Sequence, residues 1–243
     1  MNKLLLNNGK IVDDAKLLEQ KNIIIKEDSN IYLELNDYLN DINITVNDNI
    51  NCHVKILGSN VNTNLNIILN ENSNLRVDSL IFNGNNNVRI SLSGRGAVLE
   101  FIYSTVISKD SKVKFTVLHE ESDTKSSLIN NGLVLDNHKL IFDVNGVVNK
   151  ESSRCVCLQD NKIITDYANL SRILPNLFID NYDVEAEHSA YIGSFSSNDM
   201  FYLMSRGIDE DKARLLLIQS FLVGKMLLSM EETDKFISKI NNI

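Results

Sequence analysis

With 243 residues, the sequence is long enough for one large domain or for one domain with a small appendage, and its 43% hydrophobic residues can form a sizeable core. The net charge is −8 and there is no run of basic residues, which argues against binding to nucleic acid or to an anionic membrane. No stretch approaches the roughly 20 apolar residues of a membrane span, and residues 1–8 are too weakly apolar for a signal-peptide core, so we expect a cytoplasmic protein.

From about residue 20 to residue 192, the sequence predicts short strands separated by turns rich in Asn, Asp, Gly and Ser. Apolar residues alternate with polar ones, which indicates strands with one buried face. No helical pattern lies between the strands, so we expect an all-β body. The alternating apolar stripes are Leu65/Ile67/Leu69, Val88/Ile90/Leu92, Leu99/Phe101/Tyr103, Val113/Phe115/Val117 and Leu140/Phe142/Val144.

This pattern of strands is compatible with a sandwich, a barrel or a β-solenoid. No strict sequence period is visible, which argues against a regular hexapeptide helix. Asn-rich bends favour corners at which the chain passes from one sheet to the next, and stacked Asn side chains would then form ladders between coils. The residues alone leave the solenoid and the sandwich equally open.

The pattern changes to a helical one at about residue 196. Ser196 or Ser197 can cap a first helix, and Gly207 ends it. Asp209 begins a second helix with an apolar face, and a last helix is expected from about Glu231 to Ile240. We therefore predict a β domain over residues 1–195 and a small helical region over residues 196–243.

Three cysteines, an odd number without a secretory signal, indicate reduced thiols. Cys155 and Cys157 lie two residues apart, so in a strand they share one face, and we expect both to be small core residues. They form no complete zinc or iron–sulfur cage. The sequence also has no phosphate-binding loop, nucleophile elbow or metal-spaced histidine pair, so we do not expect an enzyme.

His188 is the histidine with the most suggestive surroundings, because it follows Glu185 and Glu187 and lies just before the helical region. A carboxylate close to the ring would orient the imidazole. A surface or core-edge histidine without a function is the alternative interpretation.

Four consecutive segments resemble the SufB/SufD family, the scaffold subunits of the SUF iron–sulfur assembly machine. Residues 156–165 are similar to its Tyr-Gln-x-Asn-Arg-x-Leu-Leu-Leu-Ser segment, and residues 175–179 to its Pro-x-Leu-x-Ile strand. Residues 183–193 resemble its Asp-x-Val-x-x-x-His-x-Ala-x-x-Gly strand. The helix pair around residues 201–208 is similar to the one that follows this strand in the family.

The resemblance implies a mainly β fold, a right-handed parallel β-helix followed by a small carboxyl-terminal helical region. It implies a scaffold that is not itself an enzyme, and whose helices dock an ABC-type ATPase, SufC. The partner scaffold would be SufB-like or a second copy of the chain, and a transient iron–sulfur cluster would be shared with that partner. The residues that the resemblance assigns to docking are Phe201, Tyr202, Arg206, Gly207 and Ile208.

The position at which SufB carries a cysteine is Asp160 here, whereas His188 matches the histidine of SufD. The resemblance is therefore closer to SufD, with His188 as metal ligand and Glu187 beside it in cluster assembly. Ala186 replaces a cysteine frequent in SufD, and the Glu-His pair is closer to SufB. The sequence also lacks the family's usual amino-terminal extension.

These departures keep a compact homodimeric SufB/SufD-like scaffold as an alternative. A carbohydrate-active β-helix enzyme and a purely structural solenoid are further alternatives, supported by the strand pattern alone.

Overall fold

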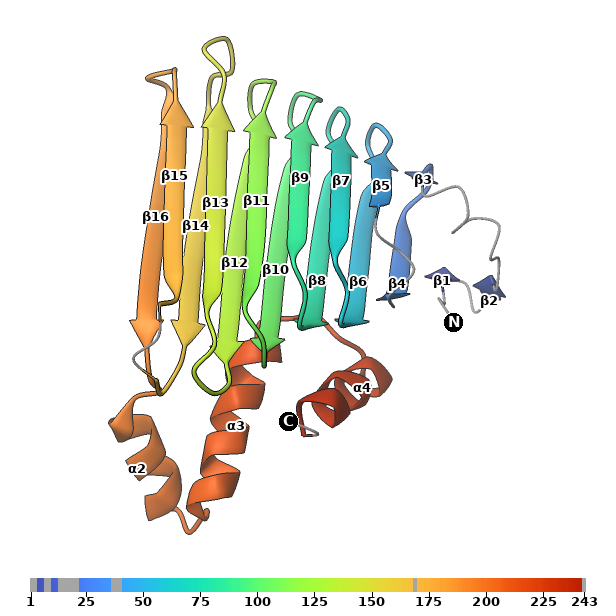
Figure 1. Cartoon of the computed structure of the whole chain (residues 1–243). Coiled ribbons are helices and arrows are strands. Elements are labelled where there is room, and N and C mark those ends of the chain that lie inside the picture. Colours follow the sequence, from blue (N-terminus) through green and yellow to red (C-terminus); the bar gives the residue numbers. More distant parts are fainter. Residues whose placement is uncertain (1–3, 7–9, 13–21, 36–40, 168–169, 242–243) are drawn as a thin grey trace.

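The computed structural model describes residues 4–6, 10–12, 22–35, 41–167 and 170–241, and they form two sheets followed by three helices (Figure 1). Successive strands alternate between the sheets, so each coil of the solenoid contributes one strand to each. We name the two sheets by the strand numbers of their coils. The even sheet contains β4 (Ser29–Leu35), β6 (Asn51–Ser59), β8 (Asn74–Phe82), β10 (Val98–Ile107), β12 (Lys125–Val134), β14 (Cys155–Ile164) and β16 (Val184–Gly193). The odd sheet contains β3 (Asn22–Ile25), β5 (Asp41–Val46), β7 (Thr63–Leu69), β9 (Asn86–Leu92), β11 (Ser111–His119), β13 (Leu140–Val148) and β15 (Arg172–Ile179).

Neighbouring strands of the coils are parallel in both sheets. The predicted parallel β-helix followed by helices is therefore confirmed, and the sandwich alternative is wrong. Side chains one coil apart are separated by 23 residues near Asn66 but by 31 residues near Asn130. Because the coil lengthens along the chain, the ladder stays in register although the sequence shows no fixed period.

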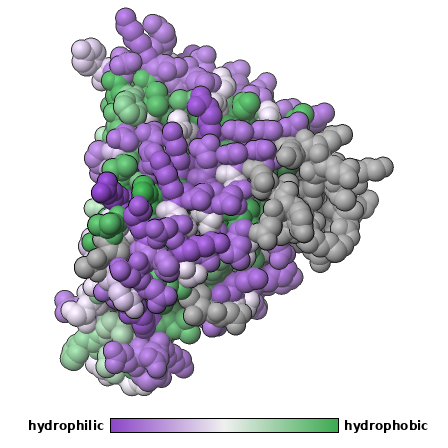
Figure 2. All heavy atoms as spheres, viewed as in Figure 1, coloured by the Kyte–Doolittle hydropathy of each residue, from purple (hydrophilic) through white to green (hydrophobic). Residues whose placement is uncertain are grey.

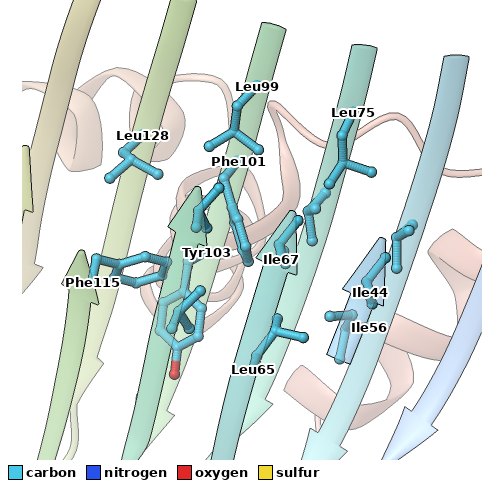
Figure 3. Packing of buried hydrophobic residues seen from close by; sticks show 14 of the residues in the cluster. Ile44, Ile56, Leu65, Ile67, Leu75, Leu99, Phe101, Tyr103, Phe115 and Leu128 are labelled. Atoms are coloured by element: carbon cyan, nitrogen blue, oxygen red, sulfur yellow. The ribbon is translucent and has the colours of Figure 1, made fainter. Parts of the chain in front are cut away.

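The interior between the two sheets is filled by the predicted apolar stripes. In Figure 3, Phe101 and Tyr103 of β10 point toward Phe115 of β11. The ring centroids lie 5.3 Å apart for Phe101–Phe115 and 5.4 Å apart for Tyr103–Phe115, in edge-to-face geometry. All three rings are buried. Alternation places these side chains inside and the intervening polar ones outside, as a two-residue period requires.

Asparagine is concentrated at corners and in ladders for two physical reasons. At the corners it tolerates the left-handed backbone, and it accounts for most of the non-glycine residues with positive φ. Within the ladders, amides hydrogen-bond from coil to coil, as between Asn66 Nδ2 and Asn43 Oδ1 at 3.0 Å. The predicted Asn ladders are therefore confirmed. The non-glycine residues with positive φ are Asn49, Asn60, Asn72, Asn83, Asp123, Asp136 and Arg154.

The two ends of the solenoid differ. At the amino-terminal end of the even sheet, β1 (Leu4–Leu6) pairs antiparallel with β4 and with β2 (Lys10–Val12). At the other end, β15 and β16 are the last strands of their sheets, and within the described residues no further strand pairs with them. Their outer main-chain groups are therefore available to a strand of another chain.

The carboxyl-terminal helices α2 (Ser197–Ser205), α3 (Glu210–Val223) and α4 (Met230–Ile240) follow the last coil (Figure 1). The predicted caps are confirmed, because the side chains of Ser196 and Asp209 accept from main-chain N–H groups of α2 and α3. Helices α3 and α4 pack on the outer face of the even sheet, where Phe236 and Leu222 join a second apolar cluster. Within the described residues, no helix is long and apolar enough to span a membrane.

One buried carboxylate ties the α3–α4 connection to the even sheet. Asp78 Oδ2 accepts from the main-chain N–H of Leu227 at 2.8 Å and lies 2.7 Å from His53 Nε2. Arg76 donates to Asp78 Oδ2 at 3.3 Å and to the main-chain oxygen of Lys225 at 2.8 Å. The helical region is thus joined to the solenoid by polar contacts as well as by apolar packing.

Candidate functional site

His188 lies on β16, at the open end of the solenoid. It is exposed, and its ring makes no hydrogen bond or ion pair with any described residue. Its partner in the parallel ladder is Gln159 of β14, which is buried in the coil interior. Since paired residues of parallel strands project from the same face, His188 belongs to the interior row but lies at its uncovered end.

Glu187 projects from the opposite face of β16. It pairs with Leu158, an outward-facing residue of β14, and Glu185 shares this outer face because it is two residues away. The structure therefore does not bring either carboxylate to the His188 ring, contrary to the expectation from their closeness in sequence. A strand places sequence neighbours on opposite faces, and this outweighs their proximity along the chain.

Cys155 and Cys157 are both buried inside the solenoid, as expected for small core residues. Cys157 pairs with Ala186, so the predicted spacing of one coil between the cysteines and His188 is confirmed. Burial raises the pKa of the Cys157 thiol, which disfavours the thiolate that binds metals. The third cysteine, Cys52, is also buried, and burial raises its pKa to about 12.

Sequence reasoning did not anticipate that several polar side chains are buried beside the apolar ones in the interior of the last coils. His119 Nδ1 lies 2.8 Å from Thr124 Oγ1, and His119 Nε2 lies 2.9 Å from Ser126 Oγ. Burial lowers the pKa of His119 to about 4, so this ring is neutral at physiological pH. Further along β12, Asn130 Nδ2 donates to Asn161 Oδ1 of β14 at 2.7 Å. The one signal in the sequence for these buried polar side chains is that polar residues interrupt the apolar alternation of the strands.

The predicted docking residues lie together on α2 and the turn after it. Phe201 is 74% exposed and Tyr202 is 58% exposed. The Arg206 guanidinium lies 5.3 Å from the centroid of the Tyr202 ring, within cation–π range. Gly207 has φ of +84°, and Ile208 N–H bonds back to Leu203 O at 3.4 Å, which closes the helix end.

Exposed apolar residues gather on this side of the molecule. Figure 2 shows hydrophobic atoms on the side where β15 and β16 lie and toward α2, beside a largely hydrophilic front face. These residues belong to the last coil and the first helix, which are adjacent in the chain. The exposed large apolar residues of β15, β16 and α2 are Leu174, Phe178, Tyr191, Ile192, Phe201, Tyr202 and Met204.

A metal bound at His188 needs ligands from outside the described residues. Among the described residues, no group of three or more His, Cys, Asp or Glu side chains is placed to hold a metal ion. An exposed imidazole can donate one nitrogen to iron or zinc, and the remaining ligands would then come from a second chain or from the cluster itself.

These features define the chain as a parallel β-solenoid with an open end and a carboxyl-terminal helical arm. A family model described as "SUF system FeS cluster assembly, SufBD core domain" matches residues 45–221. The chain therefore belongs to the SufBD core domain family of the SUF iron–sulfur assembly system.

Two curated relatives illustrate the similarity. The chain is 29% identical over 108 residues to the iron–sulfur cluster assembly protein SufD of Bacillus subtilis, an alignment that covers 44% of this chain and 24% of that protein. It is 26% identical over 109 residues to an iron–sulfur cluster assembly SufBD family protein of Staphylococcus saprophyticus, covering 44% of this chain and 23% of that protein. The aligned segment thus spans about a quarter of each relative.

Proposed function

We propose that the chain is a SufD-like scaffold subunit that supports iron–sulfur cluster assembly at a scaffold–scaffold interface, without catalytic chemistry of its own. The observation that carries the proposal is the exposed His188 on the unpaired last strand of the solenoid, next to a helical arm with an exposed apolar surface. Family membership supports the involvement of iron–sulfur clusters. The cluster is cargo in this proposal and is held only transiently.

The proposed division of labour follows the two regions of the chain. Residues 1–195 form the scaffold, and residues 196–243 bind a SufC-like ABC ATPase in the cytoplasm. The ATPase hydrolyses ATP, and its closure moves the scaffold–scaffold interface. The partner scaffold is SufB-like, and a second copy of the chain in a compact homodimer is the alternative. Neither a nucleic acid nor a membrane takes part.

Replacing Phe201, Tyr202 and Ile208 together by alanine should weaken binding of the SufC-like ATPase at least about 100-fold, because apolar anchors carry most of the energy of an interface. Binding would be measured by calorimetry with the purified ATPase. The control replaces Ile24 and Ile68, which are 58% and 43% exposed on the odd sheet, by serine. Normal binding by a folded triple variant would remove α2 from the proposed docking surface.

Replacing His188 by alanine should lower cluster transfer to an apo-ferredoxin at least about tenfold, the effect typical for the loss of a metal-site residue. Folding and ATPase binding should persist because the ring is exposed and makes no polar contact with the described residues. Replacing Cys155 and Cys157 by serine should have a smaller effect on assembly. Transfer would be followed by absorbance of the cluster.

A matched control for this variant is His138→Ala. His138 is half-buried, its Nδ1 lies 3.6 Å from Asp110 Oδ1, and it belongs to the corner between β12 and β13. Its replacement should leave transfer unchanged. If the His188 variant transferred clusters at the wild-type rate, the imidazole would have no role in assembly.

A further inference from the structure

Gln159 has a buried amide that uses only part of its hydrogen-bonding capacity. The residue is 4% exposed, and its Nε2 donates to the main-chain oxygen of Asn176 on β15 at 3.3 Å. Its Oε1 is buried and has no hydrogen-bond partner among the described residues. Buried acceptors are almost always satisfied in folded proteins, so an open one indicates a partner that binds or rotates into place.

The direction in which the free oxygen points follows from its neighbours. The Asn176 carbonyl oxygen can only accept, so the nitrogen of the Gln159 amide must face it and the oxygen must point away. Gln159 and His188 are paired in the parallel ladder of β14 and β16. Paired residues on adjacent strands lie about 4.8 Å apart and project from the same face. The His188 side chain therefore leaves β16 on the same face as the Gln159 side chain leaves β14.

The solenoid itself does not require an amide at this position. Leu128 and Phe101 occupy the equivalent positions one and two coils earlier, and both are buried. Val77, one coil further back, is buried as well. This row of paired interior residues thus changes from apolar to polar only at Gln159, one coil before the exposed His188.

We propose that Gln159 is a positioning residue for His188: when the ring turns toward β14, the free Oε1 of Gln159 accepts the N–H of one ring nitrogen and leaves the other nitrogen as a ligand at the open end of the solenoid. This inference rests on the proposed function of His188. Histidines that bind metals generally donate their other N–H to an oxygen, which fixes the tautomer and the orientation of the ring. A side-chain amide oxygen provides this acceptor without adding charge.

Two hydrogen bonds from β14 hold the strands around this pair. Gln159 reaches β15 through Asn176, and Asn161 Nδ2 donates to the main-chain oxygen of Ser189 on β16 at 3.1 Å. Ser189 also donates to Asp160 Oδ1 at 2.6 Å on the outer face. The main chain next to His188 is therefore fixed from both faces, and ring rotation is the freedom that remains for Gln159 to restrict.

The direct test is the tautomer ratio of the neutral His188 ring, measured by ¹⁵N NMR on the complete chain without a cluster. The chain has four histidines, so the ring signals can be assigned with single variants. Gln159→Leu, which reproduces the residue found one coil earlier, should change the ratio about fivefold, as expected for one net hydrogen bond. Leu158→Gln alters the opposite face and should leave the ratio unchanged. An unchanged ratio in Gln159→Leu would overturn the proposal.

A second readout separates positioning from a structural role. Gln159→Leu should lower cluster transfer in the wild-type background but have no further effect in His188→Ala, because the two residues act as one unit. An additional loss in that background would show that Gln159 acts on the fold and would contradict positioning. If the tautomer ratio changes while His188→Ala transfers clusters normally, the contact is established and the proposed function fails instead.

Discussion

Replacing Asp78 by alanine should destabilise the chain by about 3 kcal/mol, because the variant removes one partner from a buried charge network. The Asp78 side chain is 0% exposed, whereas those of its partners His53 and Arg76 are each 16% exposed. The variant leaves the Arg76 guanidinium without this buried carboxylate, and it leaves the main-chain N–H of Leu227 without its acceptor. Denaturant unfolding would measure the loss.

The same variant should loosen the α3–α4 connection more than the coils. Hydrogen exchange at residues 225–240 is therefore expected to rise by more than exchange within β10 or β11. The control is Glu231→Ala, which removes an exposed ion pair between Glu231 and Lys235 on α4 and should cost no more than about 0.5 kcal/mol. Equal losses in the two variants would show that Asp78 does not anchor the helical arm.

The Asp78 carboxylate also predicts the direction of an acid effect. Burial raises its pKa, but hydrogen bonds from His53, Leu227 and Arg76 outweigh burial and hold the pKa below the ordinary value of 3.8. A lowered pKa in the folded state adds stability above the unfolded value, and this stability is lost as pH falls through the folded pKa. The contribution of Asp78 should thus be complete at neutral pH, should begin to fall below about pH 4, and should be lost as pH falls through the lower folded pKa.

Replacing Phe115 by alanine should cost about 3–5 kcal/mol, the loss typical for a fully buried aromatic ring. Phe115 is 0% exposed and is in edge-to-face contact with both Phe101 and Tyr103, so the cavity opens in the middle of the core. Phe178→Ala is the control, since that ring is 56% exposed on the same sheet and should cost about 0.5 kcal/mol or less. The midpoint of denaturant unfolding would compare the two variants.

Much of the fold is predictable from local chemistry. Stripes such as Val113/Phe115/Val117 are buried as their alternation predicts, and Ser196 and Asp209 cap the helices they were expected to cap. The solenoid could not be distinguished from a sandwich in this way, because coil pairing joins residues that are 23 to 31 positions apart with a changing interval. The family resemblance, rather than the strand pattern, provided that distinction.

The site was less predictable, because its geometry depends on the last coil. His188 can be singled out from the sequence, but its closeness to Glu187 along the chain is misleading, because the strand places the two residues on opposite faces. Gln159 resembles an ordinary polar strand residue in the sequence, and its importance follows only from its burial and its pairing. Asp78 likewise accepts from the main-chain N–H of Leu227, which lies 149 positions further along the chain.

The two ends of the solenoid present strands of different direction to another copy. At the amino-terminal end, antiparallel β1 and β2 extend the even sheet, whereas the other end finishes on the parallel strands β15 and β16, with which no further described strand pairs. A head-to-tail joint would repeat indefinitely and produce a fibre, whereas a two-fold joint between two open ends uses both of them at once. Because the two ends differ in strand direction, a joint between like ends would give a finite pair, and it would cover strand edges that otherwise promote edge-to-edge aggregation.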